Sequence, residues 1–339
     1  MRCTISSGLR ILGMILLLIL LFCLTAQAAD AASYTRITLD EDSGSRVKVG
    51  DRYFWMEGDH LPISVNGGMV LYSSTSKTGK GVEIFRLTDE SAWTRINEVM
   101  VTNGSKIYFA AGDIEKDIIY SCNADGTSLK KLKTLKPTES ELESTYTPYY
   151  EIASVYNGRL YIVKRSSLDP AHHTLRSIGL SSGKITTHIT NCDVDWASGR
   201  GRYIYYRHHN GGGPNDTTLY AFDCKNKKSY KITDTLGARA IGTYDGKMYY
   251  YKMVTGEDGS QSMKVYSCTF SGKEDKRLFT LKNGAYQFRR SGKIYCLGRH
   301  SDSPWATPYC FDLKTGALKE ISSGEFMTAQ SSGLTSGAN

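Results

Sequence analysis

The sequence predicts an all-β fold of many short strands, and three observations predict it. The chain has 339 residues, with 33 Gly and 23 Tyr but only 7 Pro, a composition that favours strands alternating with turns. Few stretches show the 3.6-residue apolar period of a helix. A phrase of a Gly turn followed by aromatic and apolar residues recurs, for example in "YNGRLYIVKR" and "YDGKMYYYKM". We therefore expect a repeat protein made of β-hairpins.

The recurring phrase has a nearly constant period. Its glycines stand at 158, 201, 246 and 292, which are 43, 45 and 46 residues apart. One strand precedes each Gly turn, and a polar loop and two more strands follow each phrase. Four antiparallel strands in about 45 residues are typical of a β-propeller blade, because stacked sheets bury faces that a lone sheet would expose. The sequence thus predicts six four-stranded blades, starting near Leu61, Glu98, Tyr150, Cys192, Ala238 and Ala285.

The N-terminal segment is read as a secretory signal peptide over residues 1–28. Arg2 and Arg10 precede or begin an apolar run over 11–24, and Ala26-Gln27-Ala28 supplies a cleavage site. The run is short for a membrane span, although a retained anchor is the alternative. We expect a secreted or extracytoplasmic protein with no membrane span in the mature chain. Without a Lys/Arg block, its modest positive charge does not point to nucleic acid.

The rest of the chain is divided at residues 60 and 322. Residues 29–60 form an N-terminal lead-in, whose strand "YTRITL" (34–39) is expected to complete the last blade and close the ring. The stretch "VKVGDRYFWM" (47–56) is either an extra hairpin or part of a seventh blade, so seven blades are the alternative to six. The propeller is assigned to 61–322, and the polar tail 323–339 is expected to be disordered.

The repeats "DGKMYYYK…KVYSCTFSGK…KRLFTL" and the opening "VKVGDRYFW…VLYSSTSKTGKG" carry a resemblance to a known group. The chain resembles secreted bacterial six-bladed β-propellers of unknown function, which are similar in sequence style to TolB-like and low-density-lipoprotein-receptor-type propellers. The YWTD tetrapeptide of the receptor propellers and the Ser-Pro-Asp-Gly turn typical of TolB are absent. The resemblance therefore implies an architecture, and it implies no particular activity.

Charged and aromatic residues gather in the loops that join the second and third strands of the later blades. In a propeller these loops emerge on one face, where imidazole, guanidinium and indole groups could bind a polar or anionic ligand. The alternative is that long surface loops are polar for solubility alone. The predicted ligand-binding residues are Arg165, His172, His173, Arg207, His208, His209, Arg299, His300 and Trp305.

Acidic residues on the first strands are candidates for a different site, in the central channel. The strand "CDVDWAS" places Asp193 and Asp195 on one face by the two-residue period, and "INEVMV" adds Glu98. Paired carboxylates could serve a carbohydrate-active hydrolase or lyase. However, Asp193 and Asp195 come from one blade, whereas such catalysis needs groups that face each other across a substrate. Solvated charges lining the channel are the favoured interpretation.

The cysteine pattern gives no metal or redox motif, and we expect neither a cofactor nor a metal. Six cysteines follow residue 28, and none forms a Cys-x-x-Cys pair. Cys296 and Cys310 lie on adjacent predicted strands and are a disulfide candidate. Buried free thiols packed between blades are the favoured alternative.

Taken together, these features favour a monomeric binding or scaffold module at the cell surface. It would recognise a protein or a polysaccharide through one propeller face. The hydrolase or lyase is the alternative function.

Overall fold

The structure is a computed structural model. It describes residues 35–38, 46–49, 51–58, 69–87, 95–96, 99–113, 115–142, 148–166, 172–198, 201–213, 215–299 and 306–331. The chain divides into two compact units, Met1–Ser33 and Tyr34–Asn339. The predicted signal peptide lies outside the described residues. No helix in the described ranges is long and apolar enough to cross a membrane.

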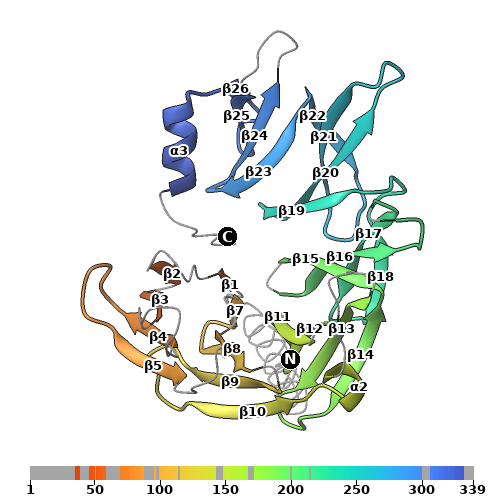
Figure 1. Cartoon of the computed structure of the whole chain (residues 1–339). Coiled ribbons are helices and arrows are strands. Elements are labelled where there is room, and N and C mark those ends of the chain that lie inside the picture. The colour runs from red at the N-terminus through yellow and green to blue at the C-terminus, as the bar shows by residue number, and fades with distance from the viewer. Residues whose placement is uncertain are drawn as a thin grey trace, which may run out of the picture. The chain divides into compact units, whose positions relative to one another are not determined.

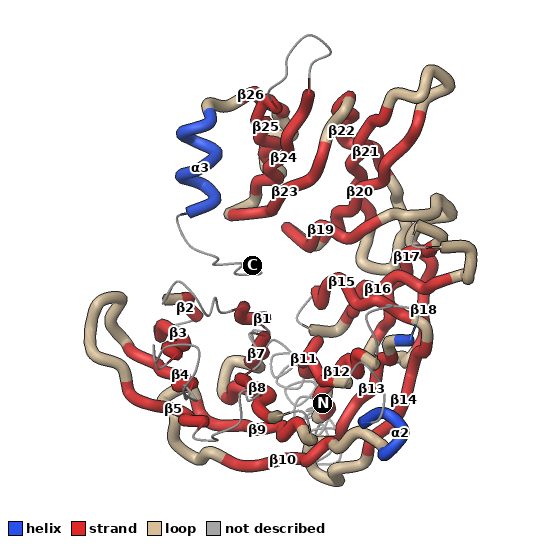
Figure 2. The backbone as a smooth tube through the Cα atoms, viewed as in Figure 1, coloured by secondary structure: helices blue, strands red, loops and turns tan. Residues whose placement is uncertain are grey.

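Strands are the main secondary structure of the described residues in the second unit, and they assemble into six antiparallel sheets (Figures 1 and 2). Sheets 3 to 6, numbered in chain order, each have four strands in sequence order. Sheet 3 consists of β11 (Tyr149–Tyr156), β12 (Arg159–Arg165), β13 (Thr174–Gly179) and β14 (Ile185–Thr190). Sheet 4 consists of β15 (Cys192–Ser198), β16 (Tyr203–His209), β17 (Thr217–Asp223) and β18 (Lys228–Lys231).

Sheets 5 and 6 repeat this plan, and their first strands begin at or beside the predicted residues. Sheet 5 consists of β19 (Arg239–Tyr244), β20 (Lys247–Thr255), β21 (Gln261–Cys268) and β22 (Lys276–Lys282). Sheet 6 consists of β23 (Ala285–Arg290), β24 (Lys293–Arg299), β25 (Ala306–Asp312) and β26 (Leu318–Glu320).

The predicted Gly turns join the first and second strands. Asn157 and Gly158 both have positive φ, at 45° and 69°, and so do Asp245 and Gly246, at 46° and 73°. Such pairs form the two-residue hairpins whose twist matches that of the strands. The first strands also share a β-bulge, with register shifts at 152–154, 194–196, 240–242 and 286–288. The repeat in the sequence is therefore also a repeat in backbone geometry.

Sheets 1 and 2 depart from the predicted N-terminal arrangement. The stretch 47–56 is neither an extra hairpin nor a seventh blade, because it forms the first two strands of sheet 1. Sheet 1 therefore begins at Val47 instead of Leu61. Its strands are β2 (Val47–Val49), β3 (Arg52–Gly58), β4 (Met69–Ser74) and β5 (Val82–Leu87).

Sheet 2 contains the strand that was expected to close the ring. Its strands are β6 (Arg95–Ile96), β7 (Val99–Thr102), β8 (Lys106–Gly112), β9 (Asp117–Asn123), β10 (Lys130–Leu135) and β1 (Thr35–Thr38). β1 pairs antiparallel with β7 from Thr35 opposite Thr102 to Thr38 opposite Val99. The prediction that 34–39 completes the last blade is therefore wrong, because the backbone hydrogen bonds of β1 go to sheet 2.

The C-terminal prediction is also wrong over 323–331, which form helix α3 (Ser323–Ser331). Ser322 Oγ accepts from the backbone N–H of Glu325 at 3.1 Å, and the Glu325 carboxylate accepts from that of Ser322 at 3.0 Å. This is a capping box. Phe326 is only 7% exposed and packs on Phe288 and Tyr295 of sheet 6. A short helix α2 (Glu139–Leu142) precedes sheet 3.

The apolar core lies between neighbouring sheets. The first strands of successive sheets contact one another, β7 with β11, β11 with β15, β15 with β19 and β19 with β23. One face of sheet 4 packs toward sheet 3 through Ile204 and Tyr206, and the other packs toward sheet 5 through Tyr205. This arrangement positions the ends of the first and second strands, where the candidate site residues lie.

Candidate functional site

Three of the predicted ligand residues belong to a buried network of ion pairs at the end of sheets 3 and 4. Arg165, the last residue of β12, pairs with Glu151 of β11 at 2.7 Å between Nη2 and Oε2. Its Nη1 donates to Asp193 Oδ1 of β15 at 3.2 Å and to His173 Nδ1 at 3.1 Å. Arg165 thus joins sheet 3 to sheet 4.

Arg207 of β16 continues the network toward sheet 5. It pairs with Asp193 through Nη2, and its Nε donates to Asp195 Oδ1 at 3.0 Å. The second oxygen of Asp195 accepts from the backbone N–H of Ala240 in β19 at 3.4 Å. Asp195 is the bulge residue of β15, and the bulge lets both carboxylates reach one guanidinium. The network therefore connects three sheets.

Burial sets the electrostatics of this network. The side chains of Arg207 and Asp195 are only 11% and 14% exposed. Burial raises the pKa of Asp195 to about 6, although Arg207 acts in the opposite direction. Burial alone would lower the pKa of Arg207, but Asp195 and Asp193 outweigh it and the pKa is raised. The network therefore keeps the guanidinium of Arg207 charged, and Asp195 takes up a proton at a higher pH than an ordinary Asp does.

The other predicted ligand residues are less buried. His172 is exposed, whereas His208 and His209 are half-buried at the end of β16, on the strand and not in the loop after it. Arg299 is exposed at the end of β24. His300, Trp305 and Glu98 lie outside the described residues. The structure thus joins Arg165, His173 and Arg207 to the channel acids Asp193 and Asp195, and leaves Arg299 apart from them.

The candidate disulfide between Cys296 and Cys310 does not form, and both cysteines are buried free thiols, as the favoured alternative predicted. In the pairing of β24 with β25, Cys296 lies opposite Tyr309 and Cys310 lies opposite Tyr295. The two cysteines are therefore offset by one residue and point to opposite faces of the sheet. All six cysteines that the structure describes are buried and free. In the same described ranges, no three His, Cys, Asp or Glu side chains gather as metal ligands.

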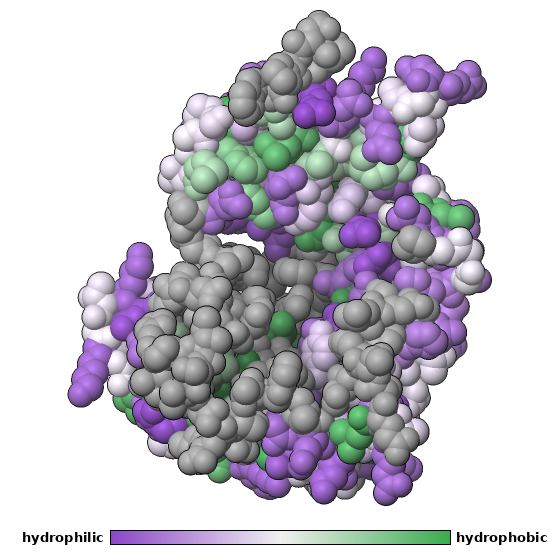
Figure 3. All heavy atoms as spheres, in the orientation of Figure 1, coloured by the Kyte–Doolittle hydropathy of each residue, from purple (hydrophilic) through white to green (hydrophobic). Residues whose placement is uncertain are grey.

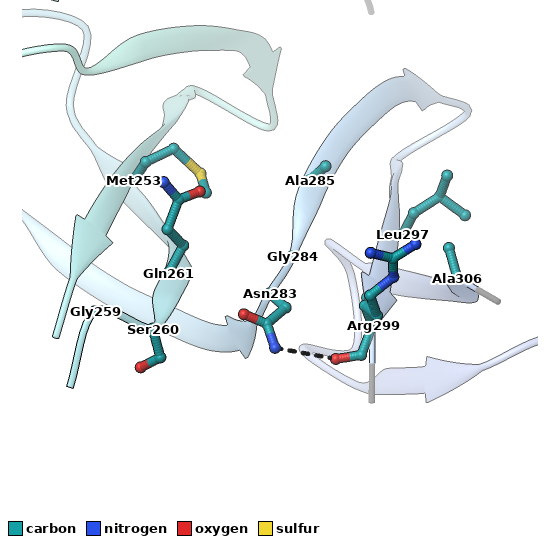
Figure 4. Close-up of a pocket in the computed structure, with 11 residues that line it drawn as sticks. Met253, Gly259, Ser260, Gln261, Asn283, Gly284, Ala285, Leu297, Arg299 and Ala306 are labelled. Carbon is teal, nitrogen blue, oxygen red and sulfur yellow. Dashed lines mark hydrogen bonds between the residues drawn. The ribbon is translucent and has the colours of Figure 1, made fainter. Parts of the chain in front are cut away.

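A pocket of about 620 Å³ opens between sheets 5 and 6, at the strand ends that include Arg299. Figure 4 shows Met253 and Gln261 of sheet 5 on one side of it, with Leu297, Arg299 and Ala306 of sheet 6 on the other. The connection 283–285 lies between them. Asn283 donates to the carbonyl oxygen of Arg299 at 3.4 Å. The pocket presents a guanidinium, two amides and apolar side chains together.

Sequence reasoning missed Glu151 and the polar pocket residues Gln261 and Asn283. Alignment of the repeats on their bulges could have found Glu151, because it occupies the place that Asp193 has in the next sheet. Nothing comparable marks Gln261 or Asn283, since their role depends on how two sheets meet.

The chain was compared with known proteins. No family model and no curated protein matches the sequence. Among solved structures, an acylaminoacyl peptidase in complex with Z-Gly-Gly-Phe-chloromethyl ketone has a TM-score of 0.50 at 17% identity, covering 86% of this chain and 46% of that chain. The β-propeller domain of the Trilobed protease from Pyrococcus furiosus has a TM-score of 0.48 at 15% identity, covering 86% and 85%.

TolB from Acinetobacter baumannii is a more distant match, with a TM-score of 0.38 at 14% identity, covering 79% of this chain and 69% of that one. The chain spans less than half the length of the acylaminoacyl peptidase. At these identities the likeness concerns the fold alone. With six antiparallel sheets, five of them with the predicted four strands in sequence order, the chain is a six-bladed β-propeller.

Proposed function

We propose that this protein is an extracytoplasmic binding or scaffold module that recognises a protein or a polysaccharide at the cell surface. The apolar N-terminal run and its cleavage sequence support the location. The contact region is the face of the propeller where the loops between second and third strands emerge. The module acts as a monomer and needs no cofactor.

The pocket between sheets 5 and 6 carries this proposal. Its volume of about 620 Å³ is within the range of small-ligand sites, and it combines apolar walls with a few polar groups. By contrast, the carboxylates of Asp193 and Asp195 already hold Arg207. Groups that satisfy each other inside a fold stabilise it and offer little to a ligand.

A retention experiment tests the function. The tagged chain is immobilised and incubated separately with protein and polysaccharide fractions of the envelope of its own source. We expect one fraction to contain a component whose retention saturates and falls as salt is raised, because a cationic site weakens with ionic strength. If the wild-type chain retains no component from either fraction at low salt, the binding function is wrong.

The alternative function, a carbohydrate-active hydrolase or lyase, draws support from one observation. A carboxyl whose pKa is raised to about 6, as in Asp195, resembles the general acid of glycoside hydrolysis. Against it, Asp195 and Asp193 share one strand and one guanidinium instead of facing each other. Turnover of a polysaccharide that disappears in Asp195→Asn, while the variant stays folded, would establish this alternative.

A further inference from the structure

Positive charge is concentrated in the segment that forms sheets 5 and 6. Residues 239–320 contain fourteen Lys and Arg but eight Asp and Glu, a net charge of +6, whereas the whole chain carries +8. Five of these acids stand in turns between strands, whereas Asp312 and Glu320 end the strands β25 and β26. A surplus of one sign near a concave site raises the local concentration of oppositely charged ligands.

Arg299 is the cation that this region presents at the pocket. It is exposed at the end of β24 and lines the pocket beside Asn283 and Gln261. A guanidinium binds a carboxylate through two parallel hydrogen bonds, and an amide N–H donates to a carbonyl or carboxylate oxygen. These three side chains therefore offer donors to an anionic, planar group and to the amide next to it.

The backbone fixes the floor of the pocket. The N–H of Asn283 donates to the carbonyl of Gln261 at 2.7 Å, and that of Gly284 donates to Leu281 at 3.2 Å. Asn283 has a φ of 45°, a left-handed conformation that Asn tolerates well. The connection from β22 to β23 is thus held against Gln261, the first residue of β21. The amides of Asn283 and Gln261 are presented from a braced surface.

The other side chains that line the pocket are apolar, and they define the rest of the ligand. Met253 is 40% exposed on β20, and Leu297, Ala285 and Ala306 add apolar surface. An exposed, flexible Met side chain adapts to apolar groups of different shape. The hairpin that carries Met253 ends in a hydrophilic tip, "GEDGS" (256–260) (Figure 3). This tip makes the rim of the pocket polar.

We propose that the pocket binds the free C-terminus of a peptide whose last side chain is apolar. This rests on the proposed binding function and names the ligand class of that site. Arg299 pairs with the terminal carboxylate, Asn283 and Gln261 donate to that group and the preceding carbonyl, and Met253 and Leu297 cover the side chain. An acidic polysaccharide would satisfy Arg299, but its hydroxyl groups would lose water against Met253 and Leu297 without gaining partners.

Fluorescence anisotropy with a defined probe tests the proposal. The full chain is titrated into fluorescein-labelled Gly-Ala-Ala-Leu with a free carboxylate, and into the same peptide as its carboxamide. We expect the amide to bind about tenfold more weakly, because a charge-assisted bidentate pair is lost. Arg299→Ala should bind the free acid as weakly as the wild-type chain binds the amide. Arg277→Ala removes an equal charge from an exposed position on β22 outside the pocket and should bind the acid normally.

The outcomes separate this proposal from the function on which it rests. Equal affinity for acid and amide, or equal effects of Arg299→Ala and Arg277→Ala, would overturn the peptide C-terminus as ligand. Oligogalacturonate that binds in an Arg299-dependent way, with no binding of the peptide acid, would replace it with an acidic polysaccharide. In each of these cases a component retained from envelope fractions leaves the binding function standing.

Discussion

Sheets 3 and 4 differ from sheets 5 and 6 at one equivalent backbone position. Just before the first-strand bulge, sheets 3 and 4 carry the acids Glu151 and Asp193, whereas sheets 5 and 6 carry Arg239 and Ala285. In sheets 3 and 4 the acids are neutralised by arginines of the second strands. In sheets 5 and 6 the positive charge is left in surplus. In sheets 3 and 4 this position belongs to an internal clamp, by which we mean the ion pairs of Arg165 and Arg207 with Glu151, Asp193 and Asp195. In sheets 5 and 6 the same blade plan forms an electrostatic surface instead.

At these strand ends, the burial of a charged residue decides its role more than its identity does. Arg207 and Arg299 both lie at the ends of second strands, yet Arg207 is buried on two carboxylates and Arg299 is exposed at a pocket.

The largest effect is expected when the clamp loses its cation. Arg207→Ala leaves Asp195 buried without its counter-charge and leaves Asp193 with Arg165 alone, and breaking such a buried pair costs about 3–5 kcal/mol. Urea unfolding monitored by tyrosine fluorescence or circular dichroism measures this loss. Arg277→Ala, at an exposed position, is the control and should change the free energy of unfolding by less than about 0.5 kcal/mol. Equal stability of the two variants would contradict the clamp.

A smaller effect is expected at the point where sheet 6 lies on the first strand of sheet 5. Gly242 has a φ of 141°, and a Cβ there would lie 2.8 Å from Nε of Arg289. Gly242→Ala should therefore cost about 3 kcal/mol, from backbone strain and displacement of Arg289. The matched change Gly158→Ala, at a φ of 69° with no atom within 4 Å, should cost about 1 kcal/mol. Equal unfolding free energies would show that the contact with Arg289 has no weight.

The clamp should also give the protein a distinctive pH dependence. Because the folded pKa of Asp195 is about 6 and an unfolded Asp titrates near 3.9, the folded state alone takes up this proton between those values. This group therefore adds stability as pH falls from about 6 to 4, by about 2 kcal/mol. Asp195→Asn removes this pH-dependent contribution to stability.

The measurement is the difference in unfolding free energy between wild type and Asp195→Asn at pH 7 and pH 4. We expect the wild type to gain on the variant at pH 4. His188, whose pKa burial and Arg159 lower to about 4, has the opposite slope but is present in both proteins and cancels. A difference that does not change with pH would mean that folding does not raise the pKa of Asp195.

The smallest effect on stability is expected at the surface region. Arg299→Ala should change the free energy of unfolding by less than about 0.5 kcal/mol, because exposed side chains contribute little. A thermal melt beside that of Arg207→Ala gives the contrast. A loss as large as that of Arg207→Ala would show that Arg299 is a structural residue too.

Much of the fold could be predicted because each repeat contains a turn whose residues favour positive φ angles. Asn157-Gly158 and Asp245-Gly246 adopt the positive φ values that the pairs imply, and sheets 4 and 6 begin at the predicted Cys192 and Ala285. The N-terminal strands were misplaced because Thr35–Thr38 carries no signal for which sheet edge it will pair with. Edge pairing depends on where the chain returns in space.

A capping motif in the sequence indicates helix α3, but the composition around it favours disorder. "SSGE" (322–325) fits the Ser-x-x-Glu capping pattern, but the small polar residues around it favoured disorder. The apolar contact of Phe326 with sheet 6 supplies the missing stabilisation, and such contacts cannot be seen in a local stretch. Similarly, the sequence predicted Arg165 and Arg207 as ligand contacts. Their partners Glu151 and Asp195 come from other strands, so these ion pairs cannot be seen in a local stretch. The bulge that directs Asp195 toward Arg207 is a feature of strand register.

The six buried cysteines give the molecule a built-in set of chemical reporters. They are spread over sheets 2, 4, 5 and 6, at Cys122, Cys192, Cys224, Cys268, Cys296 and Cys310. Burial raises the pKa of Cys122, Cys192, Cys268 and Cys296 to about 12, so in the native state these groups are protonated and shielded from alkylating reagents. Each thiol becomes reactive only when its own blade opens. Mass spectrometry of a pulse-labelled sample would therefore reveal the order in which the blades separate, without any engineered probe.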